Sequence, residues 1–203
     1  MAEAPRARGL TVVAGHFGLA AGVKAREQQA PLWALMLATA WLDVLFGPLF
    51  AMGIETLEVL PGGGYGNVVI HADYTHSVVG AAIIAAVFGL VTAVPWGRRI
   101  GIVLGAVVFS HWLLDLVVHR ADMAILPGDI GGLPRLGLGL WKVPAAAALL
   151  ELAIIAVGSY LYWRAAVTAA GAAGRDDVGR AHVLGGLVFG AGVAVLALDL
   201  LAA

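Results

Sequence analysis

The chain has 203 residues, of which 61% are hydrophobic and 12% are charged, and its mean hydropathy is +0.93. Soluble domains are about 45–50% apolar and about 25% charged, so this composition predicts a membrane protein in which residues 1–203 form one membrane domain. A formal net charge of -1 without a basic cluster gives no reason to expect a nucleic-acid partner. Because the chain has no cysteine, a protein-bound metal would need His, Asp, Glu or water as its ligands.

The apolar stretches predict about six helices embedded in the lipid bilayer. A helix needs roughly 20 mainly apolar residues to cross about 30 Å of hydrocarbon. The first stretch, 9–23, is short and predicts either a short membrane helix or an interfacial or re-entrant helix. Five longer stretches follow, at 31–53, 76–96, 100–119, 143–163 and 181–203. The predicted fold class is therefore all-α, a polytopic helical bundle without a soluble domain.

Lysine and arginine residues mark alternate loops, and this pattern predicts the orientation. Cytoplasmic loops carry an excess of basic residues, and the loops expected there contain Lys24, Arg26, Arg98, Arg99, Arg164, Arg175 and Arg180. The connection 53–75 has no Lys or Arg, so we expect it outside, together with 120–142. Six helices place the N-terminus outside, whereas five place it inside, which Arg6 and Arg8 favour.

The two outer connections contain recognisable local patterns. Residues 61–66, PGGGYG, predict a flexible turn, and residues 126–141 alternate Gly and Pro with Leu, which favours a non-helical segment at the membrane surface. Such a segment could cap a site beneath it. Asp73 or Thr75 is expected to be the N-cap of the helix that follows.

A polar stripe lies within the apolar stretch 100–119. His111, Asp115 and His119 recur at every fourth position, and residues four apart lie on the same face of a helix. An ionisable group inside a bilayer is costly and indicates a functional site, with partners elsewhere in the chain.

The helical rise of about 1.5 Å per residue gives the depth at which those partners lie. Asp43, Glu151 and, if 9–23 crosses the membrane, His16 share the depth of His111, and His76 enters at the outer surface. The sequence thus predicts one layer of imidazoles and carboxylates in the outer half of the bilayer. The candidate metal ligands are His16, Asp43, His76, His111, Asp115 and His119, and the candidate catalytic bases are Asp73 and Glu151.

Mixed imidazole and carboxylate ligands are typical of zinc, manganese or iron sites, and we favour zinc. A divalent metal lowers the pKa of bound water and polarises a phosphoryl or carbonyl oxygen. The hypothesis is therefore a metal-dependent hydrolase at the outer face of the membrane, acting on a lipid-like or other phosphoester.

Two other classes of function are compatible with the same residues. Intramembrane His and carboxylate groups also form ion sites and proton relays, which would make the chain a small ion- or proton-coupled transporter or a metal transporter. In a purely structural protein, His111 and Asp115 would be a buried pair that joins helices, and His119 would lie at the membrane interface.

Four short motifs occur in a fixed order within residues 10–130: Gly15-His16, Leu42-Asp43, His71-x-x-x-Thr75-His76-Ser77 and Ser110-His111-x-x-x-Asp115. This order resembles the YdjM-like family of bacterial membrane-bound metal-dependent hydrolases. The resemblance implies a multi-pass protein of the bacterial inner (cytoplasmic) membrane. It also implies that five of these residues are metal ligands, namely His16, Asp43, His76, His111 and Asp115. It does not identify a substrate.

The chain departs from the family pattern at two of the motifs. Where the family commonly has Pro-Asp-x-Asp, this chain reads Leu-Asp-Val-Leu with Asp43 as the single acid, so the number of metal ions is left open. Asp73 stands where the family tends to have a small residue. The His-x-x-x-Asp spacing is also similar to that of zinc-dependent phospholipase C and P1 nuclease, which favours a phosphoester over a peptide.

Overall fold

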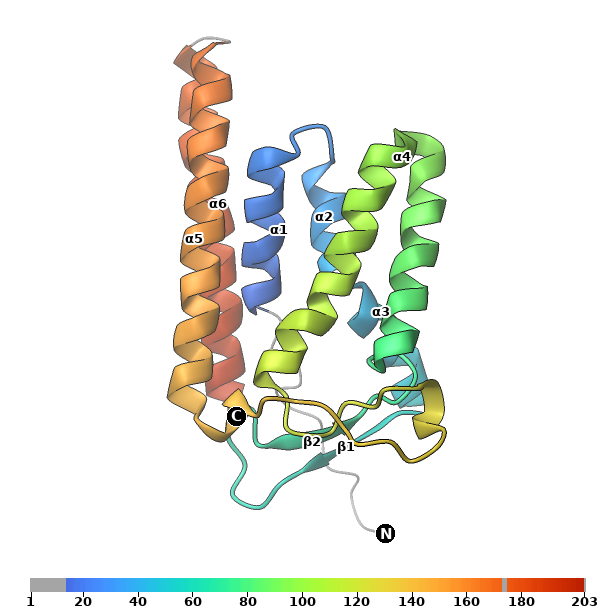
Figure 1. Ribbon diagram of the computed structural model, residues 1–203. Coiled ribbons are helices and arrows are strands. Elements are labelled where there is room, and N and C mark those ends of the chain that lie inside the picture. The colour runs from blue at the N-terminus through green and yellow to red at the C-terminus, as the bar shows by residue number, and fades with distance from the viewer. Residues whose placement is uncertain (1–13, 173–174, 203) are drawn as a thin grey trace.

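The structure is a computed structural model that describes residues 14–172 and 175–202, and the helices run side by side (Figure 1). In chain order the elements are α1 (Ala14–Arg26), α2 (Leu32–Thr39), α3 (Trp41–Ala51), β1 (Thr56–Val59), β2 (Val68–His71), α4 (Val78–Val118), the 3-10 turns η1 (Pro127–Asp129) and η2 (Leu140–Lys142), α5 (Pro144–Gly171) and α6 (Arg175–Ala202). The chain is thus mostly helical, as predicted, and the order of its helices matches the order of the apolar stretches.

Among the described residues, three helices are long and apolar enough to cross a membrane: α4, α5 and residues 177–201 of α6. The bent pair α2 and α3 would bring the number to four if the two form one broken span. Large apolar side chains on the long helices are exposed, such as Val94 at 86% and Leu90 at 72%, and exposed apolar surface of this kind is typical of lipid contact. These helices indicate a membrane protein.

Helix α4 contains two of the predicted helices, 76–96 and 100–119, as the arms of a hairpin (Figure 1). Gly97 has non-helical angles, φ 83° and ψ 160°, and this left-handed region favours glycine because it has no Cβ. The arms pack closely because their contact is made of glycines: a Cβ on Gly89 would lie 2.8 Å from the Gly101 carbonyl oxygen.

The helix cap predicted at Asp73 or Thr75 is wrong. The N-cap of α4 is Ser77, whose Oγ accepts a hydrogen bond from the Gly80 N–H at 3.2 Å. Asp73 and Thr75 lie in the turn before the helix, where other groups bind their side chains. The helix therefore begins two residues later than predicted.

The predicted helix 31–53 is broken into α2 and α3, whose axes differ by 47°. The break lies at Ala40, which has φ -103° and ψ 5°. Hydrogen bonding explains why it persists: the Thr39 carbonyl, at the end of α2, accepts a bond from His111 Nδ1 at 2.7 Å. The break therefore ties α2 to the second arm of α4.

Other boundaries also differ from the prediction. Residues 9–13 of the predicted first helix lie outside the described residues, as do Arg6 and Arg8; α1 continues to Arg26. Helix α5 continues to Gly171, eight residues beyond the predicted end at 163, and α6 begins at Arg175 rather than at 181.

A two-stranded sheet, which an all-α prediction does not include, occupies the connection 53–75 and forms a β-hairpin. β1 pairs with β2 in antiparallel register, with Thr56 opposite His71 and Val59 opposite Val68. The strands are joined by the glycine-rich turn predicted at 61–66, where the Asn67 side chain donates to the carbonyls of Leu60, Pro61 and Gly63. The all-α prediction is therefore correct for the helical bundle and incomplete for this loop.

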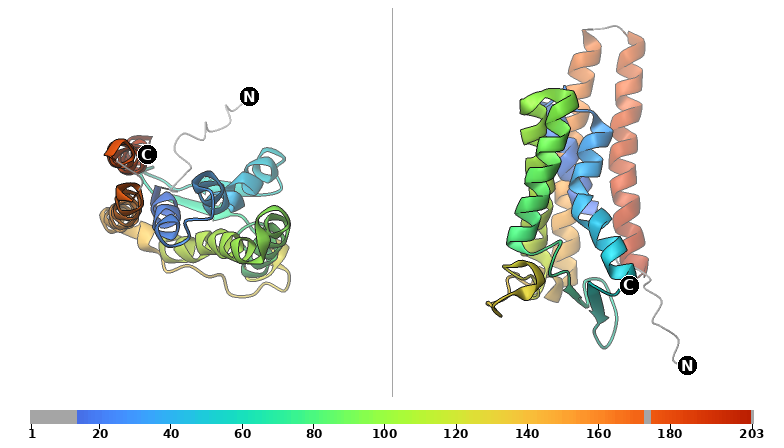
Figure 2. Two further views of the ribbon diagram at one scale, coloured as in Figure 1. Left: turned by 90° about the horizontal axis from the view of Figure 1, so that it is seen from above. Right: turned by 90° about the vertical axis from the view of Figure 1, so that its right-hand side faces the viewer.

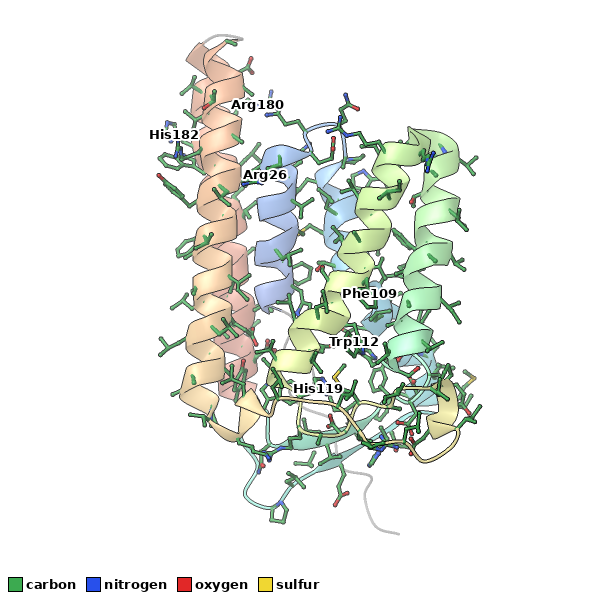
Figure 3. The ribbon with its side chains drawn as sticks, viewed as in Figure 1. Arg26, Phe109, Trp112, His119, Arg180 and His182 are labelled. Carbon is green, nitrogen blue, oxygen red and sulfur yellow. The ribbon has the colours of Figure 1, made fainter. Side chains whose placement is uncertain are left out.

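The β-hairpin formed by β1 and β2 lies at the same end of the bundle as the 120–142 segment (Figures 1 and 2), as the charge pattern predicts. We call this end the β-hairpin end. Arg26 and Arg180 lie at the opposite end, whereas His119 lies close to the β-hairpin end (Figure 3). The apolar core between these ends is formed by α1, α2 and α4, with Leu35, Leu104 and Val108 fully or almost fully buried.

Candidate metal centre

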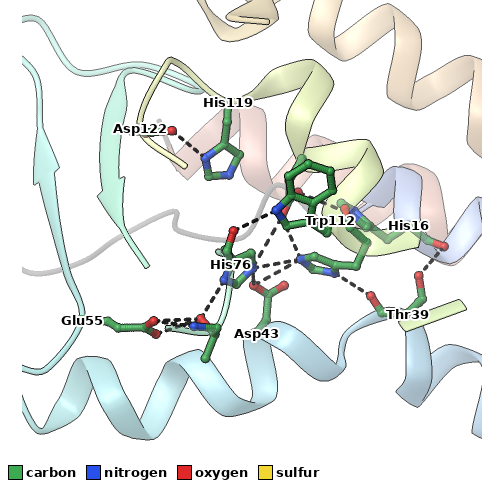
Figure 4. A network of polar contacts seen from close by, with 11 residues as sticks. His16, Thr39, Asp43, Glu55, His76, Trp112, His119 and Asp122 are labelled. Carbon is green, nitrogen blue, oxygen red and sulfur yellow. Dashed lines mark hydrogen bonds and ion pairs between the residues drawn. The ribbon is translucent and has the colours of Figure 1, made fainter. Parts of the chain in front are cut away.

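Four segments bring five of the predicted ligands together, and Figure 4 shows three of them, His16, Asp43 and His76. His16 comes from α1, Asp43 from α3, His76 from the turn before α4, and His111 and Asp115 from the second arm of α4. We call these five residues the His/Asp cluster. The bend between α2 and α3 and the turn before Ser77 are the local features that position Asp43 and His76.

One group of possible ligand atoms is formed by Asp43, His76 and His111. Asp43 Oδ1 lies 3.5 Å from His76 Nε2 and 3.6 Å from His111 Nε2, and the two Nε2 atoms are 3.3 Å apart. All three atoms therefore face a common point.

A second group is formed by His16, His111 and Asp115. Asp115 Oδ2 lies 3.0 Å from His111 Nε2 and 3.5 Å from His76 Nε2, while Asp115 Oδ1 lies 3.3 Å from His16 Nε2. Because His111 belongs to both groups and Asp115 also contacts His76, the five side chains form one continuous cluster.

These separations match those expected around a small divalent cation. Zinc bonds to nitrogen and oxygen ligands are about 2.0–2.1 Å long and tetrahedral, which places neighbouring ligand atoms about 3.3–3.4 Å apart. The measured separations between cluster atoms are 3.0–3.6 Å. The donor set of imidazoles and carboxylates, without thiolate, also suits zinc, manganese or iron.

The hydrogen bond on the far side of the His111 ring fixes which of its nitrogens can act as a ligand. His111 Nδ1 donates to the Thr39 carbonyl at 2.7 Å, so Nε2 carries the lone pair that faces the cluster. Outer hydrogen bonds of this kind orient the imidazole ligands of metal sites. The indole nitrogen of Trp112 donates to the His76 carbonyl at 2.8 Å and holds the turn before α4 against the second arm.

Burial makes the cluster costly unless its charges are compensated. His16, His76, His111 and Asp115 are at most 5% exposed, and an uncompensated buried charge is strongly destabilising. Asp43 has a 31% exposed side chain, yet its Oδ2 is buried and has no hydrogen-bond partner among the described residues. An orphaned buried carboxylate oxygen beside imidazole nitrogens is an arrangement that a cation would satisfy.

His119, predicted as a sixth ligand, lies outside both groups. It is buried, but its Nδ1 is 3.1 Å from Asp122 Oδ1 and its ring packs 4.3 Å from the Trp141 ring. The helical periodicity correctly predicts the face on which His119 lies. It does not reveal that Asp122, three residues later in the loop, would be its partner.

Asp73, predicted as a catalytic base, is instead bound by Arg135 at the end of the bundle that carries the strands. The guanidinium donates to both carboxylate oxygens, at 2.7 and 3.1 Å, and also to Asp129 at 2.9 Å. The hydrogen bond to Asp73 raises the pKa of Arg135, so the guanidinium stays charged. This contact fastens the 126–135 segment over the turn that carries His76.

Glu151, the other predicted base, joins α5 to α1 and to the loop between the strands. Its Oε1 accepts the Tyr65 hydroxyl at 2.6 Å, and its Oε2 accepts the Gly15 N–H at 3.3 Å. Burial, followed by the hydrogen bond to Glu151, raises the pKa of Tyr65, so Tyr65 remains a donor. Glu151 therefore holds α1 in place one residue from His16.

Two further residues that support the cluster are not singled out by the sequence. Thr39, which binds His111 through its carbonyl, also donates its hydroxyl to the His16 carbonyl at 3.1 Å. Glu55, fully buried after α3, binds the Thr75 hydroxyl next to His76. A backbone carbonyl leaves no sequence signal, but an acid directly after an apolar helix, in a connection without Lys or Arg to pair with it, is a signal that could have pointed to Glu55.

Comparisons of the chain with protein-family models, with curated proteins and with solved structures found no match. The resemblance to the YdjM-like family therefore stays a prediction from the motifs.

Proposed function

We propose that this chain is a membrane-embedded, metal-dependent hydrolase that acts on a phosphoester of a lipid or lipid-like molecule at the outer face of the membrane. The observation that carries the proposal is the convergence of three imidazole Nε2 atoms and two carboxylates from four segments, with ligand atoms 3.0–3.6 Å apart. Six membrane crossings, with the β-hairpin end outside and the basic loops in the cytoplasm, complete the proposed topology.

The residues of the cluster have distinct roles in this proposal. His76, His111 and Asp43 hold the cation, with His16 and Asp115 as its other ligands or as the second shell that neutralises it. Thr39 holds His111 in the tautomer that presents Nε2. When bound, the divalent metal supplies the chemistry of hydrolysis by activating a water and polarising a phosphoryl oxygen.

Access to the cluster favours an amphiphilic substrate. Asp43 is the member with a partly exposed side chain, and it lies on the same helix as Phe46 and Phe50, whose rings stack 5.6 Å apart. The Phe46 ring also meets the His76 ring edge-on at 6.1 Å. A molecule that places its polar group at Asp43 would thus have apolar surface beside it, as a lipid requires.

Asp73 and Glu151 are not assigned as bases in this proposal, because each is bound by other groups away from the cluster. Asp43 is the acid that can meet a substrate or a water, since it is partly exposed. We therefore assign the contact with the reacting group to Asp43.

The experiment combines metal analysis with turnover in detergent-purified protein. Wild type is expected to retain about one divalent metal per chain and to hydrolyse a chromogenic phosphodiester or a short-chain phospholipid. The variants His111→Ala and Asp115→Ala are expected to lose both properties. His182→Ala is a matched histidine control, because His182 binds Trp163 at the opposite end of the bundle.

Each alternative class has its own result in this experiment. Equal and negligible metal in wild type and in all variants would refute the metal site and favour a structural role for the cluster. Retained metal with ion flux in proteoliposomes, but without turnover of any phosphoester, would refute the hydrolase and favour a transporter.

A further inference from the structure

A chain of hydrogen bonds begins on the side of the His76 ring that faces away from the cluster (Figure 4). Thr75 Oγ1 lies 2.8 Å from His76 Nδ1 and 2.9 Å from Glu55 Oε2. A carboxylate can only accept, so the Thr75 hydroxyl donates to Glu55 and its oxygen accepts the N–H of His76 Nδ1. This arrangement leaves the lone pair of His76 on Nε2, which faces the cluster.

The end of this chain is held rigidly. Glu55 is fully buried, and its Oε1 accepts the backbone N–H groups of Tyr74 and Thr75, both at 2.8 Å. The carboxylate therefore fixes the backbone of the turn and the direction of the Thr75 hydroxyl together. Glu55 lies before β1, 20 residues earlier than Thr75, so the loop that forms the hairpin also delivers this acid.

We propose that Glu55 and Thr75 are positioning residues that hold His76 in the Nδ1-protonated tautomer and so aim its Nε2 at the cation. The inference rests on the proposed metal site. It adds the hydrogen bonds that link His76 through Thr75 to Glu55, just before β1. Outer-shell partners of metal-binding histidines typically contribute about 10–100-fold to metal affinity.

The test uses Thr75→Val, which keeps the shape of the side chain and the backbone bond to Glu55 but removes the hydroxyl. Thr75→Ser, which restores a hydroxyl, is the rescue variant. Thr92→Val is the matched control, since the Thr92 hydroxyl donates to carbonyls of its own helix, those of Phe88 at 2.7 Å and Gly89 at 3.2 Å. Zinc affinity is measured by competition with a chelator in detergent-purified protein. Thr75→Val is expected to weaken zinc binding by about 10–100-fold, while Thr75→Ser and Thr92→Val stay close to wild type.

A second readout does not depend on bound metal. Nitrogen-15 NMR of histidine-labelled, metal-free protein reports which nitrogen of His76 carries the proton. Wild type and Thr75→Ser are expected to show His76 protonated at Nδ1, and Thr75→Val is expected to lose this preference. This readout on wild type also tests the proposal if Thr75→Val does not fold.

The results separate this inference from the proposed function. If wild type binds no zinc, the metal site fails, and the tautomer of His76 still decides the positioning role. The positioning role is overturned if wild-type His76 is protonated at Nε2, if Thr75→Val binds zinc as tightly as wild type, or if Thr92→Val weakens binding as much as Thr75→Val does.

Discussion

Replacing Gly18 with alanine should destabilise the protein and disturb the cluster, because α1 and α5 touch at this residue without room for a side chain. A Cβ on Gly18 would lie 2.6 Å from the Ile154 carbonyl oxygen and 2.7 Å from Ile155 Cα. Both are backbone atoms, which cannot move aside as the end of a flexible side chain can. An ordinary contact of about 3.4 Å requires the helices to separate by about 0.8 Å at this point.

The magnitude follows from packing and from the position of His16, two residues before Gly18. Overpacking by one methyl group costs about 1–3 kcal/mol, and a chain of this size loses about 2–4 °C in melting temperature for each kcal/mol. His16 Nε2 lies 3.3 Å from Asp115 Oδ1, and binding sites tolerate displacements of only about 0.5 Å. A shift of about 0.8 Å should therefore also weaken metal binding by several-fold.

The assay is thermal unfolding in detergent, followed by zinc titration of the folded protein. Gly22→Ala is the matched control one turn along α1, since its Cβ would lie 3.6 Å from Gly158 Cα, which is an ordinary contact. Gly18→Ala is expected to melt several degrees below both wild type and Gly22→Ala. A Gly18→Ala protein with unchanged melting temperature and zinc affinity would refute the close α1–α5 contact as the element that positions His16.

Three further predictions test groups around the cluster. His119→Ala should leave metal content unchanged in elemental analysis, because His119 binds Asp122 and lies outside both ligand groups; loss of metal would restore it as a ligand. Tyr65→Phe should melt below wild type, and the difference in melting temperature should be constant up to about pH 10 and shrink above it. The raised pKa of folded Tyr65 means that its hydroxyl stabilises the protein fully below the ordinary pKa of 10.0, and this stabilisation is lost as the hydroxyl ionises. A difference that grows with pH would contradict this sign. Glu55→Ala should lower the free energy of unfolding by about 1–3 kcal/mol for each of the two backbone N–H groups left unpaired, whereas the exposed Glu58→Ala should not; equal melting temperatures would contradict it.

The helices of the bundle were predictable because apolar length alone specifies a membrane helix. The order of the helices follows from the length of the apolar stretches. The distribution of basic residues predicts that 53–75 and 120–142 lie at the same end. The break at Ala40 was not predictable in this way, since 31–53 is apolar on both sides of it. The break depends on Thr39, whose carbonyl pairs with a ring 72 residues away.

The strands β1 and β2 do not follow from the turn residues and charges of the loop alone. Val68–His71 contains three β-branched residues in four, a pattern that favours a strand. The Gly-rich turn before it was predicted, and together these two signals predict a hairpin. The sheet matters for the site because Glu55 directly precedes β1.

The sequence predicts the five residues of the His/Asp cluster but also adds three residues that lie outside it. The depth predicted from the sequence places His16 and Asp43 level with His111 and places His76 at the edge of that layer, and the four-residue spacing adds Asp115. Depth does not specify direction around the helix axis or competing partners. Asp73, Glu151 and His119 have the right depth or sequence spacing but are bound by Arg135, Tyr65 and Asp122, partners that lie in the irregular outer loops.

The most direct test of the metal centre is zinc K-edge X-ray absorption on the purified, zinc-loaded protein. The geometry predicts a shell of only nitrogen and oxygen ligands at about 2.0–2.1 Å, with outer scattering from at least two imidazoles in wild type and in His182→Ala. In His111→Ala, which is expected to lose the metal, this imidazole-ligated zinc signal should disappear. Absence of imidazole scattering, or a spectrum identical in wild type and His111→Ala, would contradict a cation held by the His/Asp cluster.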